Sequence, residues 1–214
     1  MTAAALKHLA AADPVMARLI REAGPCRLAH EPWRSPFQSL VLAVAHQQLH
    51  ATAAGNILGR FKKLFPKRRF PKPADLADVT DEQLRACGFS FAKIAAIRDI
   101  AAKTLDGTIP SSRQIDKLTD EEIIERLTAA RGVGRWTVEM LLIFQLGRKD
   151  VLPADDFGVR NGFRIAYNKR EMPKPKALLA FGKKWRPHGT TAAWYLWRAA
   201  DGAKRQAKPA KKKK

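Results

Sequence analysis

Two glycines flank a single aliphatic residue in the run Arg131-Gly132-Val133-Gly134-Arg135, and an arginine closes the run on each side. Glycine permits turns with unusual dihedral angles and lets backbone N–H groups approach another surface closely. Apolar residues before and after the run follow helical spacing, which predicts helix, tight hairpin and helix. With the positive end of the second helix, this turn would form an anion site suited to phosphate. The alternative is an ordinary helical hairpin, in which Gly132 only ends a helix.

A second stretch whose residues could take part in a reaction holds two adjacent carboxylates, Asp155 and Asp156, shortly after Pro153. A segment with helical spacing through Val159, Phe163 and Ile165 follows, so the plainest role of Asp155 or Asp156 is to cap that helix. A carboxylate held at a helix start could also stabilise positive charge that develops in a bound substrate, or orient an attacking water. Because a hairpin suited to phosphate is expected just upstream, the role in chemistry is favoured over that of a cap alone.

Helical spacing runs through nearly the whole chain, and period-two alternation of β-branched residues is almost absent, so we predict an all-α fold. The first helix is expected from the start signal Asp13-Pro14 to the stop at Gly24-Pro25. A strongly apolar segment then opens at Ser35-Pro36 and continues after a polar interruption over residues 46–50. The basic, proline-rich stretch 62–73 suits a surface loop.

The same helix-start signature occurs twice, as Thr80-Asp-Glu-Gln83 and as Thr119-Asp-Glu-Glu122. In such a capping box, a threonine side chain and an acidic or amide side chain three residues later satisfy exposed backbone donors. Each box is expected to begin a short helix that ends near a glycine, Gly88 or Gly132. The second of these helices leads directly into the hairpin.

The chain has 40 Lys and Arg residues against 20 Asp and Glu residues, a net charge of +20. Seven of the positive charges lie in the Ala/Lys/Pro-rich tail 203–214, which we expect to be disordered, so residues 1–203 still carry +13. A globular domain with this excess usually has a polyanionic partner, most often nucleic acid. Binding to an anionic membrane surface, or plain solubility, are the alternatives.

The two cysteines, Cys26 and Cys87, are too few for a disulfide framework or for a four-cysteine zinc or iron–sulfur site within one chain. Reduced, buried thiols are expected instead. The N-terminus lacks the pattern of a signal peptide, and no apolar run approaches ~20 residues. We therefore expect a soluble intracellular protein, cytoplasmic or associated with the nucleoid, with no membrane partner.

The residues from Leu127 to Thr137 resemble the helix-hairpin-helix of base-excision DNA glycosylases, with Ala130-Arg131 in place of the usual Leu-Pro. The stretch from Val151 to Arg160 resembles the Gly/Pro-rich loop with the catalytic aspartate that follows this hairpin in the superfamily. Trp185-Arg-Pro and residues 192–197 are similar to the C-terminal sequence pattern of the DNA-3-methyladenine glycosylase II type. The resemblance covers roughly residues 35–202 and implies the compact form without an N-terminal β domain. Two helical subdomains would then form one interleaved unit over residues 1–202.

The resemblance implies a monofunctional DNA glycosylase of base excision repair, which hydrolyses the N-glycosidic bond of alkylated purines such as 3-methyladenine and 7-methylguanine. Asp156 matches the catalytic aspartate and would stabilise the oxocarbenium-like sugar or activate water, or do both. Alkylation at ring nitrogens makes the base cationic and a good leaving group, so a general acid is dispensable. Trp136 stands where glycosylase–lyases carry a Schiff-base lysine, which argues against lyase activity.

The same resemblance places the extruded base in a cleft between the two helical clusters, stacked on aromatic side chains. The base pocket would be lined by Trp136, Met140, Phe157 and Trp197. The alternative for such aromatics is core packing, which we expect for Trp185 and Trp194. The gap left in the duplex would be filled by Gln47, Gln48 and Leu49, whose alternative is a polar helix end. The hairpin would hold DNA through Arg131, Gly132, Val133, Gly134, Arg135 and Thr137.

The expected partner is double-stranded DNA that contains alkylated bases, and we expect the protein to be a monomer. No cofactor is expected to be required, and no iron–sulfur cluster. The carbonyl groups of Thr128, Ala130 and Val133 would hold a structural Na⁺ or K⁺ ion by analogy with relatives. Two other functions stay open: a non-catalytic helix-hairpin-helix DNA-binding protein, and a glycosylase for another damaged base. An endonuclease III-like enzyme is disfavoured, because that group typically carries four clustered cysteines.

Overall fold

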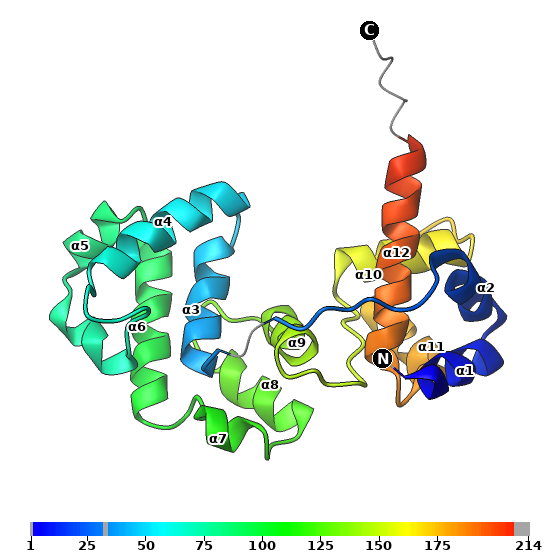
Figure 1. The fold of residues 1–214 in the computed structure, drawn as a ribbon, viewed down its shortest axis with the longest axis horizontal. Helices are drawn as coiled ribbons and strands as arrows, with labels where there is room; N and C mark the ends of the chain where they lie inside the picture. The colour runs from blue at the N-terminus through cyan, green and yellow to red at the C-terminus, as the bar shows by residue number, and fades with distance from the viewer. Residues whose placement is uncertain (1, 32–33, 208–214) are drawn as a thin grey trace, which may run out of the picture. The chain divides into compact units, whose positions relative to one another are not determined.

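The computed structural model describes residues 2–31 and 34–207, and these residues form helices and turns with no strand (Figure 1). This confirms the predicted all-α fold. The elements are α1 (Ala3–Ala12), α2 (Pro14–Ala23), α3 (Pro36–His46), α4 (Ala51–Lys63), η1 (Pro73–Asp78), α5 (Asp81–Ala86), α6 (Phe91–Leu105), α7 (Ser112–Ile115), α8 (Asp120–Thr128), α9 (Arg135–Phe144), α10 (Phe157–Ala166), α11 (Pro175–Gly182), η2 (Lys183–Trp185) and α12 (Gly189–Ala207). The two η elements are short 3₁₀ helices.

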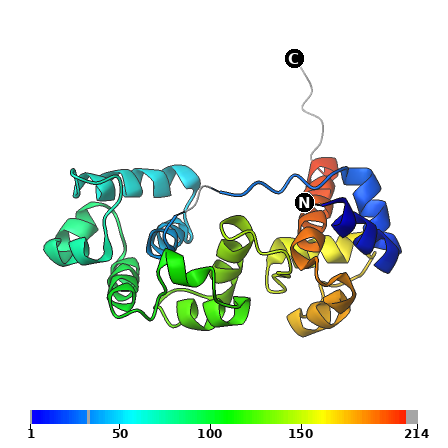
Figure 2. The ribbon, with the colours of Figure 1, turned by 60° about the horizontal axis from the view of Figure 1, so that its bottom comes forward.

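The chain divides into two compact units, each of which is described here by itself. Unit 1 combines Met1–Glu31 with Leu142–Lys214, and unit 2 comprises Pro32–Leu141. Residues 2–31 therefore fold together with the last described part of the chain, residues 142–207. In both views of the ribbon the N-terminal helix α2 lies beside α12, which also packs along α10 (Figure 2).

The packing of α10 on α12 is unusually close in unit 1. A Cβ atom placed at Gly162 in α10 would lie 1.9 Å from the carbonyl oxygen of Leu196 in α12, a distance that no side chain tolerates. The core around this contact is rich in aromatic side chains. Trp185 and Trp194 are buried in it, which confirms their predicted place.

Asp13 caps α2 as its start signal predicts, with Oδ1 accepting the backbone N–H of Val15 at 3.0 Å. The side chain is only 1% exposed, and Oδ2 accepts the hydroxyl of Tyr167 at 2.6 Å and the indole N–H of Trp185 at 3.1 Å. The ammonium group of Lys184 lies 3.0 Å away. Burial raises the pKa of Asp13, but these donors outweigh it and hold the pKa below its ordinary value. Burial and the bond to Asp13 also raise the pKa of Tyr167.

We expect Asp13→Asn to lower the free energy of unfolding at neutral pH by about 2–4 kcal/mol, because buried donors and a cation lose their anionic partner. Since the folded pKa is depressed, Asp13 stabilises the fold above its unfolded pKa and loses this effect as the pH falls through the folded value. The free energies of unfolding of the wild type and the variant should therefore become similar at acid pH. Urea unfolding of both at a series of pH values measures this, and a difference that stays constant into acid would contradict it.

In unit 2 both predicted capping boxes are formed. At α5, the N–H of Thr80 donates to the side chain of Gln83 at 2.8 Å, and at α8 the N–H of Thr119 donates to Glu122 at 2.7 Å. The glycine after each helix has a positive φ, +103° at Gly88 and +76° at Gly132. These are backbone conformations that favour glycine, so the helix stops are set locally.

The structure differs from the sequence prediction at both ends of unit 1. Helix α1 precedes the helix that was expected first, and Thr2 caps it through a 3.4 Å bond from the N–H of Ala5. Helix α12 continues to Ala207, so the expected disorder does not begin at residue 203. The good helix formers Ala, Lys, Arg and Gln at positions 203–207 account for this extension. The rest of the predicted tail, 208–214, lies outside the described residues.

The cysteine thiols lie in different units, with Cys87 buried and Cys26 half-buried rather than fully buried as expected. Burial raises the pKa of both thiols. Within the described part of the chain, no helix is both long and apolar enough to cross a lipid bilayer.

Candidate functional site

The hairpin, residues 129–134, joins α8 to α9 as predicted. Its turn is closed by the N–H of Val133, which donates to the carbonyl oxygen of Ala130 at 3.1 Å. At Gly132, the positive φ is combined with close packing, since a Cβ atom there would lie 3.3 Å from the Cβ of Ala96 in α6. A Cβ atom at Gly134 would meet nothing within 4 Å. The packing of the protein itself therefore does not require glycine at position 134.

The two arginines of the hairpin differ in their surroundings. The Arg131 side chain is exposed, and its backbone N–H donates to Asp99 Oδ2 in α6 at 2.7 Å. The Arg135 guanidinium donates to both carboxylate oxygens of Glu121, at 2.7 and 3.2 Å, and to Glu139 at 3.1 Å. The bond to Glu121 is the main reason that the pKa of Arg135 is raised. The guanidinium therefore links α9 to α8, while the Arg135 side chain stays 49% exposed, and its expected contact with DNA stays a prediction.

The expected cation ligands lie at the end of α8 and in the hairpin. The carbonyl oxygen of Ala130 accepts the N–H of Val133, which leaves it a second lone pair. Neutral backbone carbonyl oxygens of this kind fit a monovalent cation. The side chain of Val133 is buried, so this residue can meet a ligand only through its backbone, and Thr137 is half-buried in the first turn of α9. Among the described residues, no cluster of His, Cys, Asp or Glu side chains could hold a metal ion.

The wedge loop, residues 47–50, connects α3 to α4 in unit 2. Gln47 is half-buried, and its side-chain Nε2 donates to the carbonyl oxygen of Gly132 in the hairpin at 2.8 Å. Gln48 is exposed and has a positive φ of +56°, which is uncommon for a residue with a side chain. Leu49 is 39% exposed. Of the three predicted wedge residues, Gln48 and Leu49 therefore form the exposed tip, whereas Gln47 ties the loop to the hairpin.

Asp156 caps α10 in unit 1, where Oδ1 accepts the N–H of Val159 at 2.7 Å. The same oxygen accepts the indole N–H of Trp197 in α12 at 2.7 Å. A Cβ atom at Gly158 would lie 2.8 Å from Trp197 Cδ1 and 3.1 Å from Asp156 Oδ1, so the missing side chain lets the indole reach the carboxylate. The predicted cap is confirmed, and it holds the carboxylate in a fixed orientation that also suits electrostatic catalysis.

The predicted pocket aromatics are exposed to different degrees. Phe157 is 61% exposed and Trp136 is 49% exposed, so a large part of each ring is accessible to a ligand. Met140 lies one turn after Trp136 on α9 and is half-buried. Trp197 is half-buried and stacks against Phe144, with ring centroids 5.9 Å apart and planes at 21°. The part played by Phe144 was missed, because nothing in the sequence pairs it with α12.

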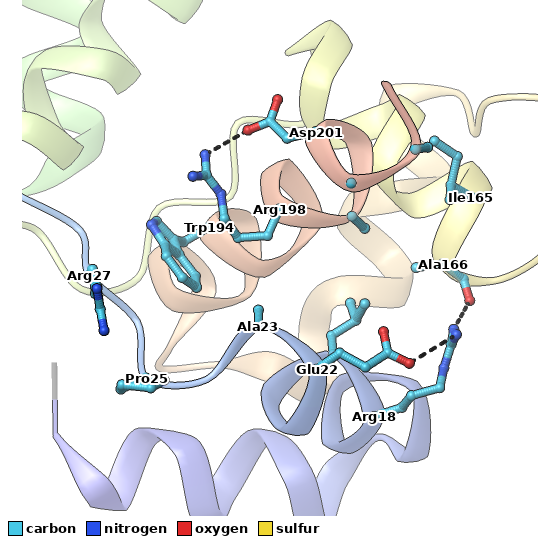
Figure 3. Close-up of a pocket in the computed structure, with 14 residues that line it drawn as sticks. Arg18, Glu22, Ala23, Pro25, Arg27, Ile165, Ala166, Trp194, Arg198 and Asp201 are labelled. Carbon is cyan, nitrogen blue, oxygen red and sulfur yellow. Dashed lines mark hydrogen bonds and ion pairs between the residues drawn. The ribbon is translucent and has the colours of Figure 1, made fainter. Parts of the chain in front are cut away.

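A cavity of about 890 Å³ lies in unit 1, between α2, the end of α10 and α12 (Figure 3). Trp194 stands on its wall, and most of its charged side chains are satisfied within the protein. Arg18 donates to the carbonyl oxygen of Ala166 at 2.7 Å, and Arg198 pairs with Asp201 at 2.9 Å. None of the predicted catalytic or base-pocket residues lines this cavity, so it is separate from them.

The glycine hairpin, the exposed tip bonded to it and the carboxylate-capped helix after it define a helix-hairpin-helix protein of the kind that binds nucleic acid. The family model of the HhH-GPD superfamily of base excision DNA repair proteins matches residues 41–187, and the chain belongs to this family. This confirms the resemblance inferred from the sequence.

Proteins similar to this chain come from a yeast and a bacterium. DNA-3-methyladenine glycosylase 1 of Schizosaccharomyces pombe is 43% identical over 198 residues, which are 90% of this chain and 85% of that protein. The structure of an S. pombe 3-methyladenine DNA glycosylase in complex with abasic DNA has a TM-score of 0.76 at 43% identity, covering 91% of this chain and 95% of that one. A DNA-3-methyladenine glycosidase from Bacillus halodurans has a TM-score of 0.85 at 37% identity, covering 94% and 91%.

Proposed function

We propose that this protein is a monofunctional DNA glycosylase that acts on double-stranded DNA and releases alkylated purines, 3-methyladenine and 7-methylguanine among them. The observation that carries the proposal is the fixed carboxylate of Asp156, in a chain whose family repairs DNA by base excision. The names of the similar proteins support the choice of alkylated purines. We further propose that it acts as a monomer and requires no cofactor.

The proposed chemistry rests on charge. When the glycosidic bond breaks, positive charge builds on the deoxyribose, and the carboxylate of Asp156 stabilises it or orients the attacking water. The hydrogen bonds from Val159 and Trp197 hold this carboxylate in place before the substrate binds. A base alkylated at a ring nitrogen is cationic and leaves without a general acid. Trp136 stands where a lyase needs an amine, so no Schiff base forms there.

The proposed recognition of DNA uses exposed groups in both units. In unit 2, Trp136 offers an aromatic ring on which a cationic base can stack, and Met140 lies one turn from it on α9. In unit 1, Phe157 and Trp197 offer such rings, and each stacking interaction contributes about 0.5–2 kcal/mol. The backbone N–H groups of Gly132 and Gly134, together with the exposed side chain of Arg131, bind phosphate. Gln48 and Leu49 replace the extruded base in the stack. The hairpin carbonyls would hold Na⁺ or K⁺, which screens nearby phosphate charge.

The decisive experiment incubates the purified protein with methylated duplex DNA and separates the released bases by chromatography. Free 3-methyladenine and 7-methylguanine are the expected products, and the strand should stay intact until alkali cleaves the abasic site. Strand nicking without alkali would contradict the monofunctional assignment. Tight DNA binding with no release of any base would instead identify a non-catalytic DNA-binding protein.

A further inference from the structure

Helix α6 holds the base of the wedge loop. The ammonium group of Lys93, near its start, donates to the carbonyl oxygens of Ala45 at 2.9 Å and of Gln47 at 2.8 Å. These carbonyls end α3, where the last groups of a helix lack partners within it. Lys93 is half-buried, and burial lowers the pKa of its ammonium group. The contact therefore satisfies the end of α3 directly before the exposed tip.

The same face of α6 also holds the hairpin. Ala96 lies against Gly132, close enough that a Cβ atom there would be 3.3 Å from its own Cβ. Asp99 Oδ2 accepts the backbone N–H of Arg131 at 2.7 Å, while its Oδ1 accepts the ammonium group of Lys103 at 2.6 Å. Lys93, Ala96 and Asp99 are three residues apart and so share one side of the helix. One rigid element thus contacts both segments that are proposed to touch DNA.

A direct bond closes this arrangement. The side chain of Gln47 donates to the carbonyl oxygen of Gly132 at 2.8 Å, so the wedge loop and the hairpin are joined without an intermediate. The backbone carbonyl of Gln47 is one of the two that accept the ammonium group of Lys93. The next residue, Gln48, has the left-handed backbone conformation. The direction of the tip is therefore set by contacts to α6 and to the hairpin, rather than by the loop alone.

We infer that Lys93 is a positioning residue, which fixes the wedge loop relative to the hairpin. The segment that binds phosphate and the segment that extrudes the base then form one rigid body. The inference rests on the proposed function. Phosphates bound at the hairpin fix the register of the duplex, so a tip displaced by a fraction of an ångström no longer enters the gap left by the base. Loss of Lys93 should therefore impair extrusion while phosphate binding persists.

The test compares one lesion in two settings under single-turnover conditions: opposite its normal partner base, and opposite an abasic-site analogue, where less pairing has to be broken. Lys93→Met keeps the apolar stem of the side chain and removes its charge. We expect excision of the paired lesion to fall by about tenfold, and excision of the unpaired lesion to change by less than about twofold. Lys93→Arg, which can still donate to both carbonyls, should restore most of the paired rate.

Lys117→Met is the matched control, because Lys117 is an exposed lysine of unit 2 whose side chain makes no bond to the wedge loop or the hairpin. It should leave the ratio of the two rates at the wild-type value. The Lys93→Met protein used must melt at the wild-type temperature. If its excision rate falls equally on both substrates, or falls on neither, the inference is overturned.

A second readout does not depend on catalysis. The fluorescence of 2-aminopurine placed opposite an abasic-site analogue rises when a wedge unstacks it. At saturating protein, the wild type should raise this fluorescence and Lys93→Met should raise it much less, with similar DNA affinity. An unchanged rise in the variant would refute the positioning role. A wild type that raises the fluorescence but releases no base would refute the proposed function alone, and the variant would still decide the inference.

Discussion

Asp156→Asn is expected to reduce base release on the order of 10²–10³-fold or more, because a neutral amide cannot stabilise positive charge on the sugar. The amide oxygen can still accept the N–H of Val159 and the indole N–H of Trp197, and asparagine caps a helix about as well as aspartate. The fold and the affinity for DNA should therefore change little. Single-turnover release and fluorescence anisotropy with labelled duplex measure the two quantities separately.

The matched control is Asp155→Asn, which removes the neighbouring carboxylate one residue upstream. Asp155 is exposed and does not cap α10, so its variant should keep nearly the full rate. Asp156→Asn with wild-type activity would exclude the electrostatic mechanism proposed for this residue. Equal losses in both variants would point to net charge in the loop as the cause.

Gly162→Ala is expected to cause a large loss of stability, about 3 kcal/mol, because its Cβ atom would lie 1.9 Å from a backbone oxygen of Leu196. Backbone atoms cannot rotate away as a side chain can, so α10 and α12 must move apart. Asp156 starts α10 and Trp197 lies on α12, so the bond between them should weaken as well. Excision should then fall even at temperatures where the variant remains folded.

Gly59→Ala provides the control for this substitution. Gly59 also lies within a helix, α4, but a Cβ atom there meets nothing within 4 Å. Alanine should stabilise that helix by about 0.5–1 kcal/mol. Denaturant unfolding of both variants compares them, and a Gly162→Ala protein as stable as the wild type would show that the two helices can separate at little cost.

The helix boundaries that could be predicted are those with local signals. The capping boxes at Thr80 and Thr119, the Asp13-Pro14 start and the glycine stop at Gly24 all appear in the structure where the sequence places them. Each of them is a hydrogen bond or a backbone preference confined to a few neighbouring residues. Helix α1 was missed although Thr2 caps it, because its alanine-rich sequence shows little amphipathic contrast.

The roles of individual side chains were harder to predict. Arg135 was expected to bind DNA from its place in the hairpin, which stays a prediction, but its pairing with Glu121, fourteen residues earlier, was not foreseen. Gln47 was expected in the wedge, and its bond to Gly132, which spans 85 residues, was not foreseen. Neither pairing leaves a trace in residue spacing, because it depends on how whole helices pack.

The sequence by itself determined that the chain is helical, that a glycine hairpin joins α8 to α9 and that one of the pair Asp155 and Asp156 begins a helix. These features need only neighbouring residues, whose hydrogen bonds and dihedral preferences act within one turn. Only the tertiary structure decided what orients the carboxylate, since Trp197 reaches it from 41 residues away across the gap at Gly158. Contacts of this kind arise when α10 and α12 pack at a distance that glycine permits, and packing is a property of the whole unit.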